Sequence, residues 1–106
     1  MNINLNKLLL KAVELGNLEA VKLLLKEGAD PAYNDNAAIF FASQNGHKDI
    51  VELLLKDKRV NPSDNFNNAI VWAYENGHKS IVELLIKDKR VRKSLPEERI
   101  KKYENM

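Results

Sequence analysis

The amino-acid sequence predicts an all-α protein: a single domain of helical hairpins stacked side by side. Residues 45–55 return almost unchanged at 76–86, thirty-one residues later, and a looser copy stands thirty residues earlier at 15–25. In each copy the apolar residues keep helical spacing. A period of this length with fixed apolar positions is typical of stacked repeat arrays. The sequence therefore predicts three units of similar structure.

The first hairpin is predicted over residues 5–14 and 18–27. Leucine, alanine and valine recur in both segments at the spacing of one helix face. Gly16 supplies the left-handed residue that commonly ends a helix, and Asn17 is suited to cap the next one. Two helices joined by so short a turn must lie antiparallel and in contact.

The same pair of helices is predicted twice more, after Asn/Asp-rich loops that contain proline. The predicted segments are helices at 37–45, 48–57, 68–76 and 79–89, within repeats at about 5–31, 32–62 and 63–91. Leu24, Leu54 and Leu85 are expected at equivalent buried positions. The sequence Ser-Leu-Pro-Glu at 94–97 has the form of a capping box, so a last helix is predicted over about 94–103. Its charged composition suits the end of a stack.

The order of loop, outgoing helix, Gly-His turn and Leu-rich returning helix resembles the ankyrin repeat. The residues that carry the resemblance recur over 5–91 and are Gly46-His47, Gly77-His78, residues 50–55 and 81–86, Gly28-Ala29-Asp30-Pro31, and Asn61-Pro62. The resemblance implies an α-solenoid of 1–106 that binds a protein partner without catalysis, through the concave surface of its loops and first helices.

The sequence also departs from the family pattern. The Thr-Pro-Leu-His opening of the first helix is absent at 37–40 and 68–71. The repeats span 30 to 31 residues rather than 33, so the loops are expected to form tight turns without strands. Tyr74 stands where the family has a small residue, which predicts altered packing in the third repeat.

No candidate catalytic, cofactor or metal site emerges from the sequence. His47 and His78 are the only histidines, and their equivalent places in successive repeats keep them apart. A metal site needs three or four converging ligands. We expect each imidazole to tie its turn to a neighbouring backbone. The acids lie on regular helical surfaces, and no serine has a His–acid neighbourhood. The sequence predicts a protein that is not an enzyme and holds no cofactor.

Composition narrows the setting. The 106 residues carry a net charge of +2 and no cysteine, which excludes disulfides and mildly favours a reducing compartment. The apolar runs are too short to cross a membrane, and the first seven residues lack the order of a secretory signal. The sequence predicts a cytoplasmic protein, with nuclear entry left open, and no membrane association.

The aromatic side chains suggest where a partner binds. Six of the seven lie in the loops and first helices of the second and third repeats. Phe41 and Trp72 are expected in the core. Local packing and capping remain alternative roles for the aromatic and asparagine side chains of the loops and first helices. The predicted partner-binding residues are Tyr33, Asn34, Asn36, Phe40, Gln44, Asn65, Phe66, Asn67, Tyr74 and Glu75.

Two other functions remain open at this point. Basic residues gather at 56–59 and 87–93, which permits association with nucleic acid. The leucines at 8–10 permit self-assembly through the N-terminal hairpin. We expect a monomer or a weak homo-oligomer.

Overall fold

The computed structural model describes residues 3–106; Met1 and Asn2, which begin the segment considered for a signal, lie outside that range. The described residues form helices joined by turns, with no strand among them. The helices are α1 (Leu5–Glu14), α2 (Leu18–Lys26), α3 (Tyr33–Gln44), α4 (Lys48–Leu55), α5 (Asp64–Glu75), α6 (Lys79–Lys87), α7 (Lys89–Ser94) and α8 (Glu97–Glu104). The prediction of an all-α fold is confirmed. None of these helices is both long and apolar enough to span a bilayer.

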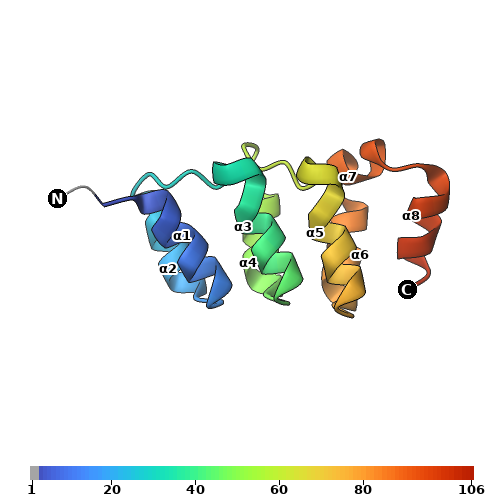
Figure 1. The fold of residues 1–106 in the computed structure, drawn as a ribbon, viewed down its shortest axis with the longest axis horizontal. Coiled ribbons are helices and arrows are strands. Elements are labelled where there is room, and N and C mark those ends of the chain that lie inside the picture. The colour runs from blue at the N-terminus through green and yellow to red at the C-terminus, as the bar shows by residue number, and fades with distance from the viewer. Residues whose placement is uncertain (1–2) are drawn as a thin grey trace.

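The helices form two rows along an elongated molecule. Figure 1 shows α1, α3 and α5 side by side in front, with α2, α4 and α6 behind them and α8 at the C-terminal end. The principal extents are 50 × 22 × 18 Å. Each hairpin packs on its neighbours along the row, as stacked repeats do.

The core runs continuously between the hairpins. Leu54 and Leu85 are fully buried. Leu24, the equivalent residue of the first repeat, packs against the core but is only half-buried. Its partial exposure arises because no unit packs on the N-terminal side of α1 and α2 within residues 3–106. The predicted burial of these leucines is therefore confirmed for Leu54 and Leu85, and it is wrong for Leu24, which lies at the edge of the stack.

The C-terminal segment differs from the sequence-based prediction. The prediction that residues 94–97 form a capping box is wrong. Ser94 ends α7, and its Oγ donates to the carbonyl of Val91 at 2.7 Å. Helix α8 follows Pro96, whose side chain makes no capping hydrogen bond. The short helix α7 occupies a stretch where no helix was expected. It forms because the carboxylate of Asp88 accepts from the backbone N–H of Arg90 and caps the first turn.

Helix α8 covers the end of the third repeat. Ile100 and Tyr103 are buried on it, and Tyr103 meets Tyr74 edge to face with ring centroids 5.4 Å apart. The ammonium group of Lys102 lies 4.8 Å from the centre of the Tyr74 ring. Tyr74 thus packs against an element that follows the repeats, which agrees with the expectation of altered packing at that residue.

Candidate partner-binding surface

Two left-handed turns lead into the first helices of the second and third repeats. All three residues of 34–36 have φ between 54° and 62°, and all three of 65–67 have φ between 54° and 59°. Regular right-handed helix then begins at Ala37 and Asn68, as the sequence predicts. The left-handed region costs roughly 1–2 kcal/mol per ordinary residue, and Asn and Asp tolerate it best. Phe66 is the exception among the six.

A line of asparagine side chains, at equivalent positions of the three repeats, contacts the following loop or helix; its members are Asn6, Asn36 and Asn67. The Oδ1 of Asn6 accepts from the backbone N–H of Asp30 at 2.7 Å, and the Oδ1 of Asn36 accepts from that of Asn61 at 2.8 Å. The Nδ2 of Asn36 also donates to the carboxylate of Asp64 at 2.9 Å. These contacts hold the loop edges of successive repeats in register.

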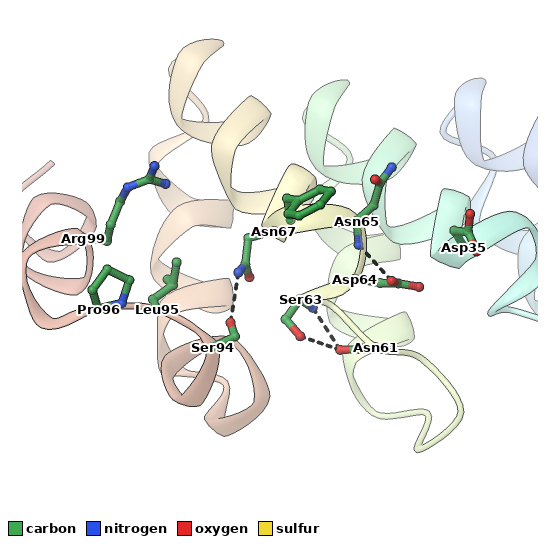
Figure 2. Close-up of a pocket in the computed structure, with 11 residues that line it drawn as sticks. Asp35, Asn61, Ser63, Asp64, Asn65, Asn67, Ser94, Leu95, Pro96 and Arg99 are labelled. Carbon is green, nitrogen blue, oxygen red and sulfur yellow. Dashed lines mark hydrogen bonds between the residues drawn. The ribbon is translucent and has the colours of Figure 1, made fainter.

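The line is incomplete at its last member. The Nδ2 of Asn67 donates to the Oγ of Ser94 at 2.9 Å, as Figure 2 shows. Its Oδ1 is buried and has no hydrogen-bond partner in the described part of the chain. The N–H of Arg92, which stands where the second loop has Asn61, instead bonds to the carbonyl of Asp88 within α7. Asn36 and Asn67, both predicted to contact a partner, are therefore buried and organise the loops.

The histidines connect the turns at the opposite edge. The Nε2–H of His47 donates to the carbonyl of Glu14 at 3.0 Å, and that of His78 donates to the carbonyl of Gln44 at 2.9 Å. Each ring also packs over the glycine of the preceding turn. The structural role predicted for the imidazoles is confirmed. The described residues contain no cluster of His, Cys, Asp or Glu that could hold a metal ion.

The remaining predicted residues differ in exposure. Tyr33, Phe40 and Gln44 are half-buried, and so is Tyr74, beneath Lys102. Phe66 is 94% exposed. The other predicted positions, Asn34, Asn65 and Glu75, are also exposed. The first helices and their turns therefore present a polar surface with a few aromatic side chains.

The expectation that Trp72 lies in the core is wrong. Its side chain is 43% exposed on α5, while Phe41, at the equivalent place on α3, is half-buried against the core. Lys11 occupies this place in the first repeat and is exposed. That lysine was the signal in the sequence that could have identified Trp72 as a surface residue.

Two hollows lie along this surface. The smaller, of about 210 Å³, is lined by Asn34, Asp35, Ala37, Phe40, Phe41, Asn65 and Asn68. The larger, of about 770 Å³, is open to solvent between the turn of α5 and the start of α8 (Figure 2). Its lining residues are Asp35, Asn61, Ser63, Asp64, Asn65, Phe66, Asn67, Ser94, Leu95, Pro96 and Arg99. Both hollows mix amide, carboxylate and apolar groups.

The arginines of the predicted basic patches are engaged within the protein. Arg90 donates to the carbonyls of Val60 at 2.6 Å and Leu55 at 3.0 Å, and it pairs with Asp88 at 2.8 Å. Burial alone would raise the pKa of Asp88, but the hydrogen bonds from Arg90 outweigh burial and hold that pKa below its ordinary value. Arg90 therefore joins the third repeat to the second, which weakens the case for phosphate binding.

The exposed Arg59 is also paired. It forms a two-pronged contact with Asp57, with N–O distances of 3.1 and 2.8 Å, and these hydrogen bonds lower the pKa of the carboxyl group. Arg92 reaches Glu104 at 3.0 Å and so ties α7 to the end of α8. The surface lysines are what remains of the basic patches.

Comparison with known proteins agrees with the geometry. A family model described as ankyrin repeats (3 copies) matches residues 6–95, which is most of the chain. No curated protein and no solved structure matches the chain. The described residues show the three hairpins, the strand-free turns and the histidine contacts that the sequence predicts. The chain belongs to the ankyrin repeat family.

Proposed function

We propose that the protein binds a protein partner through the surface formed by its left-handed turns and first helices, with Phe66 as the principal apolar contact. Ankyrin repeats are generally protein–protein interaction modules and are typically non-catalytic.

The observation that carries the proposal is the position of Phe66. Its ring is 94% exposed and its backbone has a φ of 58°. A bulky residue in this conformation costs about 1–3 kcal/mol, and an exposed ring gains little from packing in return. The second repeat places Asp35 at the same position with a φ of 54°, a residue that suits the turn better. An apolar ring held at this cost is consistent with a contact that forms only in a complex.

Other side chains extend the proposed surface along the first helices. Trp72 is partly exposed on α5, and Phe40 lines the smaller hollow between α3 and α5. Exposed amide and carboxylate groups surround them at Asn65 and Glu75. Aromatic residues are enriched among the residues that dominate binding energy at interfaces. The asparagine and histidine contacts already order the backbone, so binding loses little conformational entropy.

The sharpest test replaces Phe66 by the residue of the preceding repeat. Phe66→Asp should leave the free energy of unfolding equal or higher, because Asp tolerates the left-handed turn. Proteins captured from cells of the source organism would be quantified by mass spectrometry with the wild-type protein and with this variant as bait. The proposal expects a specific set of proteins to be lost with Phe66→Asp.

A second bait, Ser80→Asp, makes the matched control. It adds the same carboxylate at an exposed position of α6, outside the proposed surface, and should retain the same set of proteins. An unchanged set with Phe66→Asp contradicts the proposal. So does binding that survives this substitution but collapses with rising salt, because steep salt dependence indicates phosphate contacts.

A further inference from the structure

Asp35 lines both hollows of the first-helix surface. It accompanies Phe40 in the smaller hollow and Phe66 in the larger one. Its side chain is exposed and takes part in no ion pair within residues 3–106. An unpaired carboxylate therefore lies beside aromatic side chains on the surface that the proposed function assigns to a partner.

A second carboxylate, that of Asp64, lines the larger hollow and is held in place by hydrogen bonds. Its Oδ2 accepts from the Nδ2 of Asn36 at 2.9 Å, and its Oδ1 accepts from the backbone N–H of Asn65 at 2.8 Å. Figure 2 shows Asp35 and Asp64 on the same side of this hollow. Two negative charges on one side of a hollow favour a ligand group of positive charge.

An unpaired oxygen adds to the negative character of the larger hollow. Asn67, which also lines it, is only 6% exposed, and its buried Oδ1 has no hydrogen-bond partner in the described residues. The equivalent oxygen of Asn36 accepts from a backbone N–H at 2.8 Å. Asp35 and Asn67 thus both carry oxygen atoms without a donor. A basic side chain, which carries donors and no acceptor, complements this field.

We infer that the partner contributes a basic side chain, arginine or lysine, which pairs with Asp35 and lies against the ring of Phe66. This inference rests on the proposed function and names the chemistry of its partner. Arginine suits the site best, because its planar guanidinium can stack on an aromatic ring while it donates to a carboxylate.

The ring of Phe66 is available to a cation from outside the protein. It is 94% exposed, and the face of an aromatic ring attracts positive charge. Within the described residues the cation–ring contacts are those of Lys102 with Tyr74 and Tyr103, so no lysine or arginine covers Phe66 there. The exposure of this ring in a costly turn is therefore explained by a cation as well as by an apolar contact.

Arg99 carries the opposite charge and lies on the other side of the larger hollow (Figure 2). It takes part in no ion pair within residues 3–106, and an acidic partner residue beside it is the alternative. Glu97 and Glu98 are exposed in the same first turn of α8 and offset its charge. Two lining carboxylates and an unpaired oxygen against one guanidinium favour the basic residue.

A random linear peptide library displayed on phage tests the charge of the ligand with the full chain. It is selected against the wild-type protein, against Asp35→Asn, and against Glu52→Gln, a matched control that removes one charge on α4 outside both hollows. Asparagine tolerates the left-handed turn, so Asp35→Asn should keep the fold. Peptides enriched on the wild type and on Glu52→Gln should share an arginine or lysine, which peptides enriched on Asp35→Asn should lack.

Fluorescence anisotropy with the strongest peptide then measures the contact. Exchange of its arginine for citrulline, or of its lysine for glutamine, should weaken binding to the wild type roughly tenfold or more, the size of one charge-assisted hydrogen bond. The same exchange should change binding to Asp35→Asn by less than about threefold, because the carboxylate is absent. Phe66→Leu keeps an apolar side chain and removes the ring, so it should weaken the basic peptide more than the neutral one. Arg99→Gln should leave binding of the basic peptide equal or tighter.

An acidic residue shared by the selected peptides overturns the inference. So does a basic residue that is still selected on Asp35→Asn, and so does the absence of any shared residue. Capture with Phe66→Asp tests the proposed function separately. Proteins that are lost with Phe66→Asp but retained with Asp35→Asn leave the proposed function standing and overturn the basic contact. Proteins that are retained with Phe66→Asp contradict the proposed function, while the peptide selection still decides whether a cation binds at Asp35.

Discussion

Replacing Asn36 or Asn67 by alanine measures the value of the asparagine line between repeats. Asn36→Ala removes a hydrogen bond to the N–H of Asn61 and another to the carboxylate of Asp64. A neutral bond contributes about 1 kcal/mol and one to a charged group about 1.5–3 kcal/mol. Alanine in the left-handed turn adds about 1–2 kcal/mol. The expected loss is about 4–6 kcal/mol.

Asn67→Ala should cost much less, although the two residues have nearly the same backbone, with φ of 62° and 59°. It removes one bond, to Ser94, and also removes a buried oxygen that has no partner in residues 3–106. Leaving such a group unpaired costs about 1–3 kcal/mol, so its removal offsets most of the loss. The expected net change is about 1 kcal/mol.

Urea unfolding followed by the fluorescence of Trp72 gives both free energies. Glycine variants of the same two residues remove the backbone penalty and leave the hydrogen-bond difference. They also keep the comparison open if Asn36→Ala is too unstable to study, since domains of this size have about 5–15 kcal/mol in total. An equal loss of unfolding free energy at Asn36 and Asn67 would refute the inference that the unpaired Oδ1 of Asn67 is costly.

Three further predictions concern the ends and turns of the stack. Gly46→Ala should destabilise the fold by about 1–3 kcal/mol more than Gly77→Ala, because both have positive φ but only at Gly46 does a Cβ lie 2.8 Å from an imidazole carbon; equal melting temperatures would contradict this. The pKa of Asp88 lies below its ordinary value of 3.8, so its ionised form stabilises the fold above about pH 4, and this contribution is lost as the pH falls further. The difference in urea midpoint between wild-type and Asp88→Asn proteins should therefore be constant from pH 7 to 5 and shrink only below about pH 4. Tyr103→Ala should release α8 at a cost of about 3 kcal/mol; hydrogen exchange should rise in α8 while the amides of α1 and α2 stay protected, and uniform acceleration would count against a separable last helix.

The repeat pattern predicted most of the fold because the same side chains face the same neighbours in each unit. The helix starts at Ala37 and Asn68, the turns with His47 and His78, and the strand-free loops all follow from local sequence and period. The third repeat was less predictable at its end. Lys93 replaces Pro62 there, and without proline the chain continues into α7.

The binding surface was predictable only in outline. Asn34 and Asn65 are exposed as expected, but Asn36 and Asn67 have the same residue type and are buried. Sequence does not separate them, because their roles depend on residues that lie 25 and 27 positions further along the chain. The exposure of Trp72 depends on which side of α5 faces the stack. A comparison with Lys11 at the same place in the first repeat would have indicated that side.

The histidine contacts give the stack a direction. Each imidazole belongs to a later repeat and binds a carbonyl that lies 33 or 34 residues earlier in the chain. The first turn has Asn17 in place of a histidine. During synthesis every acceptor therefore leaves the ribosome before its donor, and each new hairpin meets a base that has already formed. Shortening the protein from its C-terminal side leaves every remaining imidazole with its carbonyl acceptor. Removal of the first hairpin, in contrast, leaves His47 without its acceptor.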